Sequence, residues 1–195
     1  IADSDFVDVP IYKLLDKKYL KFRSNKLETN MKIPEIKPGS ILHKETSSYI
    51  YANSLELPST THISIVDEYG NALSMTSTIE SSFGSRLMTN GGFLLNNELT
   101  DFSFQKEKKG KRVANNIEPN KRPRSSMAPT IIFKNDKPLF IIGSPGGSNI
   151  IGYVVNSIIG LVDWKMNVQQ AASIPHAINK FGTFYLEKNS KISLL

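Results

Sequence analysis

Residues 59–67 read STTHISIVD, a short polar run that passes directly into alternating apolar and polar residues. The alternation predicts a β-strand that begins at Thr61. A hydroxyl at the head of a strand can attack the preceding carbonyl, and hydrolysis of the resulting ester would leave Thr60 as a new N-terminus. Its hydroxyl would then be a nucleophile and its own α-amine, with a pKa near neutrality, the base. A threonine pair before a strand also arises from β-propensity alone, so the choice depends on the rest of the chain.

The composition is that of an ordinary globular protein of 195 residues, with 39% hydrophobic and 22% charged residues. A net charge of +6 is compatible with an anionic partner or, more simply, with a lysine-rich surface. The absence of cysteine excludes disulfides, thiolate metal sites and cysteine nucleophiles. No apolar run reaches the roughly 18 residues of a membrane span. The chain opens on Ile1, and we expect it to be a fragment of a longer protein.

Periodicity predicts short strands between helices, and therefore mixed α+β layers. Residues 25–58 hold Pro34, Pro38, Gly39 and Pro58 among polar residues and predict a connecting segment, whereas residues 103–124 predict a polar, basic loop. The helices are expected at 10–24, 149–162 and 167–173. The strands are expected at 61–67, 71–78, 130–133, 139–142 and 184–186, of which the first four form two hairpins.

Residues 143–148 read GSPGGS and lead into one of these helices. Adjacent glycines let backbone amides approach a ligand closely, and a helix N-terminus favours negative charge. The amides of Gly146 and Gly147 could therefore form an oxyanion hole. The alternative is a flexible strand-to-helix turn. The stretch is not a phosphate-binding Walker loop, because no Gly-Lys-Ser/Thr follows it.

Two further stretches carry polar groups that suit an amino-acid ligand. In residues 94–102, LLNNELTDF, a turn could converge Glu98 and Asp101 on an ammonium group, although both could equally be solvated loop acids. In residues 121–129, KRPRSSMAP, Ser125 and Ser126 could hydrogen-bond a carboxylate. An exposed basic loop explains the second stretch as well, whereas a nucleic-acid patch would need interleaved aromatic residues.

His62 follows the threonine pair directly, but successive residues of a strand face opposite sides. Its side chain is therefore expected on the opposite face from that of Thr61, and we do not expect it to be the general base.

Four stretches occur in one fixed order: the threonine pair with His62, LLNNELTDF, RPRSSMAPT (122–130) and GSPGGS. Together they closely resemble the small subunit of the γ-glutamyltranspeptidase (glutathione hydrolase) family of N-terminal-nucleophile hydrolases. The resemblance extends from about Thr60 to Leu186. Residues 1–59 resemble the end of that family's large subunit, including the DFVDVP stretch at 5–10.

The resemblance implies a four-layer αββα sandwich, incomplete in this chain, and a precursor that cuts itself between Ser59 and Thr60. The products would be a heterodimer of a large subunit ending with residues 1–59 and a small, catalytic subunit covering 60–195, which we expect to be truncated at its C-terminus. Because the family's large subunit is mostly missing, we expect this chain to be inactive alone.

The resemblance also assigns roles to particular residues. Thr60 would be the nucleophile with its α-amine as base, and Thr78 would hydrogen-bond the Thr60 hydroxyl or amine and assist processing. Gly146 and Gly147 would form the oxyanion hole. The α-ammonium of the substrate would be held by Glu80, Glu98 and Asp101, and its α-carboxylate by Ser125 and Ser126.

The implied reaction transfers the γ-glutamyl group of glutathione or another γ-glutamyl compound to Thr60, and then to water, an amino acid or a dipeptide. The resemblance implies no metal or organic cofactor, no nucleic-acid partner and, by family habit, a periplasmic or extracellular location. The nearest alternative is a related acylase that cleaves glutaryl or β-lactam side chains. A remote one is a non-catalytic basic binding module, supported only by residues 106–124.

Overall fold

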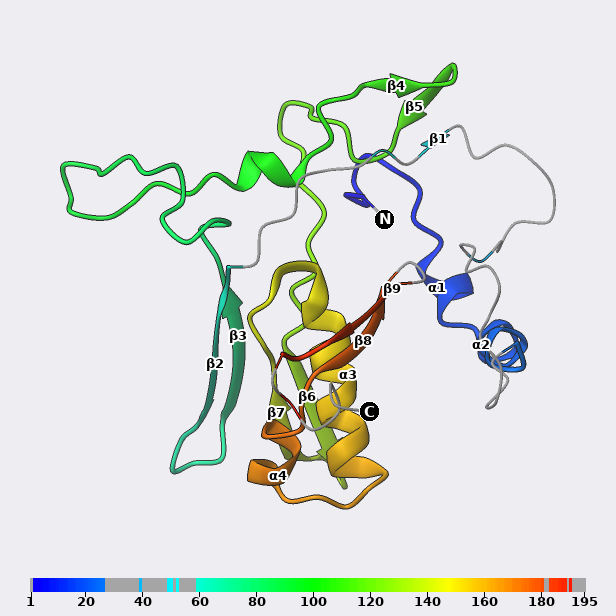
Figure 1. Cartoon of the computed structure of the whole chain (residues 1–195), viewed down its shortest axis with the longest axis vertical. Coiled ribbons are helices and arrows are strands. Elements are labelled where there is room, and N and C mark those ends of the chain that lie inside the picture. Colours follow the sequence, from blue (N-terminus) through cyan, green and yellow to red (C-terminus); the bar gives the residue numbers. More distant parts are fainter. Residues whose placement is uncertain are drawn as a thin grey trace. The chain divides into compact units, whose positions relative to one another are not determined.

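In the computed structural model the chain divides into two compact units, and Figure 1 labels their helices and strands. One contains Ile1–Asn53, Phe102–Arg124 and Asn179–Thr183, and the other contains Ser54–Asp101, Ser125–Ile178 and Phe184–Leu195. The described residues are 2–26, 39, 49–50, 52, 59–180, 183–188 and 190. Most of the predicted connecting segment, 25–58, therefore lies outside the described residues.

The first unit begins with two short helices, where the sequence predicted a single helix over 10–24. Helix α1 (Ile11–Leu14) ends after one turn, and α2 (Lys17–Ser24) starts again after Asp16. The Asp16 carboxylate accepts a hydrogen bond from the Tyr19 amide at 2.9 Å and so caps α2. The prediction of one continuous helix was wrong, because apolar spacing does not reveal an N-cap that interrupts it.

The first unit also contains a three-stranded sheet in the order β1-β5-β4. Strand β1 (Tyr49–Ile50) pairs in parallel with β5 (Lys111–Val113), and β4 (Glu107–Lys108) pairs with β5 in an antiparallel hairpin. The predicted loop at 103–124 thus contains two short strands. Val113 and Phe102 are almost completely buried and form part of this unit's core.

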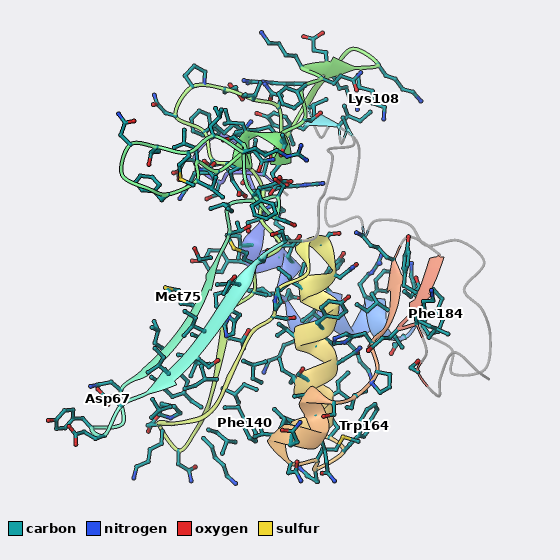
Figure 2. All side chains as sticks on the ribbon, turned by 60° about the vertical axis from the view of Figure 1, so that its left-hand side comes forward. Asp67, Met75, Lys108, Phe140, Trp164 and Phe184 are labelled. Atoms are coloured by element: carbon teal, nitrogen blue, oxygen red, sulfur yellow. The ribbon has the colours of Figure 1, made fainter. Side chains whose placement is uncertain are left out.

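The second unit contains both predicted hairpins. Strand β2 (Thr61–Val66) pairs with β3 (Ala72–Ser77), with Thr61 opposite Ser77. Strand β6 (Thr130–Lys134) pairs with β7 (Lys137–Ile142), with a bulge at Ile132/Phe133. In Figure 2, Asp67 marks the β2–β3 turn, where its carboxylate accepts hydrogen bonds from the Tyr69 and Asn71 amides.

The two faces of the β2–β3 hairpin differ because its residues alternate between polar and apolar. Ser64 and Ser74 are cross-strand partners, and their hydroxyls donate to the Ile141 and Ile142 carbonyls of β7 at 3.3 and 3.1 Å. The other face carries apolar side chains that are 41–50% exposed in this chain. They are Ile63, Ile65, Leu73 and Met75, the last of which is marked on β3 in Figure 2.

Helix α3 (Ile150–Val162) confirms the helix that the sequence predicted, and it follows the short 3₁₀ helix η2 (Gly147–Asn149), which the sequence did not predict. Its buried positions include Ile150, Val154 and Leu161, which recur at helical spacing. Helix α4 (Val168–Ala172) begins with a reciprocal capping box between Asn167 and Gln170. In the part of the chain that the structure describes, no helix is long and apolar enough to cross a membrane.

The remaining elements are the 3₁₀ helix η1 (Glu98–Asp101) and a two-stranded sheet of β8 (Ala177–Lys180) and β9 (Thr183–Leu186). The sequence predicted β9 but not β8, whose residues AINK lack a clear alternation. The described chain is thus a mixture of helices and short strands, in agreement with the predicted α+β class.

Candidate active site

The Ser59 carbonyl, which precedes Thr60, accepts two hydroxyl hydrogen bonds. One comes from the Thr60 hydroxyl itself, and the other comes from Thr78 at 2.9 Å. The Thr78 oxygen in turn accepts a hydrogen bond from the Glu80 amide at 2.9 Å. In this uncut chain the Thr78 hydroxyl therefore points to the carbonyl, whereas the sequence analysis expected it on the Thr60 hydroxyl or amine.

This arrangement follows from the hairpin register. Thr61 pairs with Ser77 at the end of β2–β3, so Ser59 and Thr60 leave one strand beside the point where Thr78 leaves the other. A donor on a carbonyl oxygen withdraws electron density from the carbonyl carbon, and the Thr78 hydroxyl would stabilise negative charge on this oxygen during attack. The Ser59 carbonyl is thus polarised by one hydroxyl group while a second, that of Thr60, lies beside it.

Glu80 is buried close to this hydroxyl pair and is incompletely hydrogen-bonded. Its side chain accepts a hydrogen bond from Asn97 through Oε2, while Oε1 is buried without a partner among the described residues. Its backbone φ of 72° lies in the left-handed region, which is uncommon for residues other than glycine. A buried, partly unsatisfied carboxylate on a strained backbone is a feature of ligand sites.

Glu98 and Asp101 lie one turn apart at the two ends of η1. Burial, a hydrogen bond to the Asp101 carboxyl and repulsion from Asp101 and Glu80 raise the pKa of Glu98 to about 7. Glu98 Oε2, like Glu80 Oε1, is buried without a hydrogen-bond partner in the described chain. The three acids predicted to bind an ammonium group are thus brought together, and a cation would relieve their mutual repulsion.

Asn97 organises this acidic cluster, although the sequence analysis did not single it out. Its side-chain amide donates to Glu80, and its Oδ1 accepts from the Ser81 amide and hydroxyl at 3.0 and 3.1 Å. Its backbone amide donates to the Ile79 carbonyl at 3.2 Å. One feature of the sequence could have identified Asn97. It directly precedes Glu98, in a stretch already singled out for its acidic residues. Among the described residues, no group of three His, Cys, Asp or Glu side chains is arranged to hold a metal ion.

The two glycines of GSPGGS adopt conformations that require glycine. Gly146 has φ 134° and Gly147 has φ 55°, and a Cβ on Gly146 would lie only 2.7 Å from the Tyr153 ring. The described residues supply no hydrogen-bond acceptor for either amide. Both N–H groups are therefore available to an oxyanion, as the oxyanion-hole interpretation requires.

Ser125 and Ser126 are not brought together with the acids by any hydrogen bond within the described chain. Ser125 is exposed and accepts a hydrogen bond from the Met127 amide at 3.1 Å, and Ser126 is half-buried. Their role in carboxylate binding stays a prediction.

His62 packs against Gly143, where an added Cβ would lie only 2.1 Å from the imidazole ring. Its Nδ1 lies 2.8 Å from Thr76 Oγ1, its Nε2 lies 3.0 Å from Ser64 Oγ, and burial lowers its pKa. Both ring nitrogens are thus engaged within the hairpin. His62 accordingly has a structural position that joins the two hairpins.

A groove of about 870 Å³ lies in the same unit, between β2, β7, α3 and α4. Its lining includes Val66, Phe140 and Leu161, but none of the predicted site residues. The groove is therefore not part of the candidate site.

Comparison with known proteins gives a consistent result. The family model described as gamma-glutamyltranspeptidase matches residues 1–195. The chain is 38% identical over 181 residues to the glutathione hydrolase proenzyme of Bacillus subtilis (strain 168), which covers 89% of this chain and 30% of the relative. A crystal structure of a mutant Helicobacter pylori gamma-glutamyltranspeptidase has a TM-score of 0.60 and 45% identity, over 66% of this chain and 73% of that chain.

A relative with another name is also similar. The acylase ACY 1 proenzyme of Pseudomonas sp. (strain V22) is 31% identical over 189 residues, which is 96% of this chain and 30% of the relative. The chain thus spans about 30% of the length of the curated relatives described here.

Proposed function

The chain belongs to the gamma-glutamyltranspeptidase family, and on this premise we propose that the protein cuts itself before Thr60 and then acts as a γ-glutamyltransferase and glutathione hydrolase. The observation that carries the proposal is the pair of hydroxyl groups, Thr60 and Thr78, on the Ser59 carbonyl. These groups supply the nucleophile and the polarising donor that self-cleavage needs at the bond to be broken.

In the first step, Thr60 Oγ1 forms a bond to the Ser59 carbonyl carbon. Negative charge develops on the Ser59 oxygen, where the Thr78 hydroxyl donates a hydrogen bond. The C–N bond then breaks, and the hydroxyl proton passes to the Thr60 nitrogen, which leaves an ester. Water hydrolyses this ester to a Ser59 carboxylate, a free Thr60 hydroxyl and a free α-amine.

In turnover, the new α-amine accepts the proton of the Thr60 hydroxyl as the oxygen attacks the γ-carbonyl of the substrate. The oxyanion is stabilised by the amides of Gly146 and Gly147, which have no competing acceptor in the described chain. The leaving amine takes the proton, and an acyl-enzyme remains. Water, an amino acid or a dipeptide then accepts the γ-glutamyl group.

Substrate recognition rests on the zwitterionic end of a γ-glutamyl group. The acidic cluster of Glu80, Glu98 and Asp101 holds the α-ammonium and thereby relieves its own repulsion. Ser125 and Ser126 hold the α-carboxylate.

The processed protein is a heterodimer in which the chain before Thr60 and the chain from Thr60 onward complete a four-layer αββα sandwich. The exposed apolar face of β2–β3 supports this arrangement, because a covering layer would bury Ile63, Ile65 and Met75.

The decisive experiment is the intact mass of the full-length protein beside its Thr60→Ala and Thr60→Ser variants. Two fragments are expected from the parent, the later one beginning at Thr60, and one uncut chain from Thr60→Ala. Thr60→Ser keeps a hydroxyl nucleophile and should still cut, more slowly. A single uncut chain in the parent would overturn the proposal.

A second candidate is the acylase activity on glutaryl or β-lactam side chains that the sequence analysis names as the nearest alternative, and similarity to a protein named as an acylase favours it. A glutaryl group has no α-ammonium and so makes no use of the acidic cluster. Comparing kcat/KM for a γ-glutamyl anilide and a glutaryl anilide separates the two candidates, and we expect the γ-glutamyl compound to be preferred. Preference for the glutaryl compound would favour the acylase.

A further inference from the structure

The first compact unit is built from both sides of the Ser59–Thr60 bond. Ile1–Asn53 precedes that bond in the sequence, whereas Phe102–Arg124 follows it. The buried residues also come from both sides: Ala2 and Val7 from the first segment, and Val113 from the second. This unit can therefore exist after cleavage only as an association of two chains.

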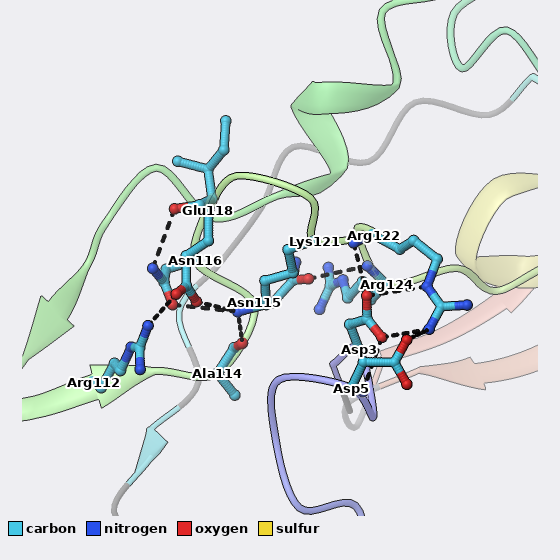
Figure 3. A network of polar contacts seen from close by, with 11 residues as sticks. Asp3, Asp5, Arg112, Ala114, Asn115, Asn116, Glu118, Lys121, Arg122 and Arg124 are labelled. Atoms are coloured by element: carbon cyan, nitrogen blue, oxygen red, sulfur yellow. Dashed lines mark hydrogen bonds and ion pairs between the residues drawn. The ribbon is translucent and has the colours of Figure 1, made fainter.

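Asp3 and Arg122 form the main polar contact across the two segments, 119 residues apart (Figure 3). Asp3 Oδ2 accepts from the Arg122 amide at 2.8 Å and from Nε at 3.0 Å, and Oδ1 accepts from Nη2 at 2.7 Å. The same Nη2 lies 2.6 Å from the Asp5 carboxylate. The Asp3 side chain is only 1% exposed, and the guanidinium holds its pKa well below the usual range. A buried charge with these partners depends on Arg122 for its compensation.

The loop that presents Arg122 is itself held in place. Lys121, with a side chain only 1% exposed, donates to the Ala114 carbonyl and to Glu118, each at 2.8 Å. The Arg124 amide donates to Asn115 Oδ1 at 3.0 Å. Arg122 is therefore positioned before Asp3 binds. These contacts also weaken the alternative of a basic binding module, because they leave the Lys121 ammonium group unavailable to an external anion.

A second attachment lies at the other end of the earlier segment. Strand β1 pairs in parallel with β5, with Ile50 beside Val113, and the Ala114 amide donates to the Ile50 carbonyl at 3.1 Å. The earlier segment is thus attached to the same small region, 112–122, at two separate points.

We propose that the contact of Asp3 and Asp5 of the earlier product with Arg122 of the later one is a clamp that keeps the two products of cleavage together. The proposal rests on the proposed cleavage before Thr60. Cleavage removes the covalent link and with it the high effective concentration that made these contacts intramolecular. From then on the Asp3–Arg122 contact contributes directly to the affinity between the subunits.

The chain offers a matched control in Arg112, whose guanidinium pairs with Glu118 and whose backbone pairing with Tyr49 of β1 does not depend on the side chain that the substitution changes. Arg112 and Glu118 both follow Thr60, so their ion pair stays within one product. The test compares Arg122→Gln with Arg112→Gln in the cleaved full-length protein, tagged on the earlier product, by measuring the dissociation constant of the subunits on dilution. Arg122→Gln should raise this constant at least about tenfold, whereas Arg112→Gln should leave it within about twofold. Equal effects of the two substitutions, or no effect of either, would overturn the clamp.

A second version of the protein distinguishes a failure of the clamp from a failure of self-cleavage. Thr60→Ala with a site for a specific protease inserted after Pro58 can be cut on demand, so the clamp is measured even if Thr60 is not a nucleophile. If Arg122→Gln does not fold, Arg122→Lys replaces it. Lysine keeps the charge but cannot make the paired contacts, and it should weaken association at least threefold. An unchanged constant for Arg122→Lys would then refute the proposal.

Discussion

Two groups of carboxylates in this chain have opposite surroundings. In the acidic cluster, Glu80 and Glu98 each keep one buried oxygen that has no hydrogen-bond partner among the described residues, and burial and repulsion raise the pKa of Glu98 to about 7. In the clamp, Asp3 is also buried, but Arg122 satisfies both of its oxygens and lowers its pKa. Asp3 is compensated by a cation of the protein itself, whereas Glu98 is compensated by a proton near neutral pH.

The difference separates a binding site from a structural contact by physical criteria alone. A buried carboxylate must be compensated by a proton, a protein cation or a ligand cation. Asp3 uses Arg122, while Glu98 retains a proton near neutral pH that a ligand's ammonium could displace. The acidic cluster should therefore govern substrate affinity, and the clamp should govern assembly.

The largest expected effect comes from removing a charge of the acidic cluster. Asp101→Asn should lower kcat/KM for a γ-glutamyl anilide by about 100-fold, because a charge-assisted hydrogen bond to the ammonium is lost. The control is Asp136→Asn, in the exposed β6–β7 turn, which should retain parental activity. If the two variants behaved alike in steady-state kinetics, the acidic cluster would not be the ammonium site.

A smaller effect is expected at Asn97, which we expect to act through the position of Glu80. Asn97→Ala removes the donor to Glu80 Oε2 and should raise KM by about tenfold with little change in kcat. Asn97→Asp should raise KM more than Asn97→Ala does, since it adds a negative group beside the acids. A fall in kcat at constant KM would instead place Asn97 in the chemical step.

A change in pH should alter the affinity for L-glutamate several-fold. Below about pH 7, Glu98 carries a proton that an ammonium ligand must displace, so the affinity for L-glutamate should rise as pH increases through 7 and level off about one unit higher. Calorimetry in two buffers with different ionisation enthalpies should detect proton release on binding at pH 6.5. In Glu98→Gln this release should disappear, and its persistence would assign the proton to another group.

The smallest effect is expected on the thermal stability of the protein without ligand. Glu98 has a folded pKa above its unfolded value, so its contribution is fully present below about pH 4.5 and is lost as pH rises through about 7. Glu98→Gln should therefore raise the thermal midpoint at pH 8 by about 1 °C and leave it unchanged at pH 4.

Asp3 provides the opposite control for this stability prediction. Its folded pKa is lowered, so its contribution is present above pH 4 and is lost as pH falls further. Asp3→Asn should accordingly lower the midpoint at pH 8, as measured by thermal unfolding of the uncut Thr60→Ala protein. Shifts of the same sign in the two variants would remove the distinction between the clusters.

The local pattern of apolar and polar residues was sufficient to predict much of the fold. Both hairpins and helix α3 lie within a residue or two of the predicted bounds, because alternation and helical spacing report how each segment buries its apolar side. The pattern failed where a single polar contact decides the structure. Asp16 interrupts a helix by capping the next one, and strand β1 exists through its pairing with β5.

By itself, the sequence determined the order of the motifs, the hydroxyl at the head of β2 and the family to which the chain belongs. Only the tertiary structure decided that Thr78 donates to the Ser59 carbonyl, that Glu80 joins Glu98, and that Asp3 is bound by Arg122. The physical reason is separation along the chain. Propensity and periodicity describe neighbours a few residues apart, whereas these contacts join groups that become neighbours only when distant segments fold together.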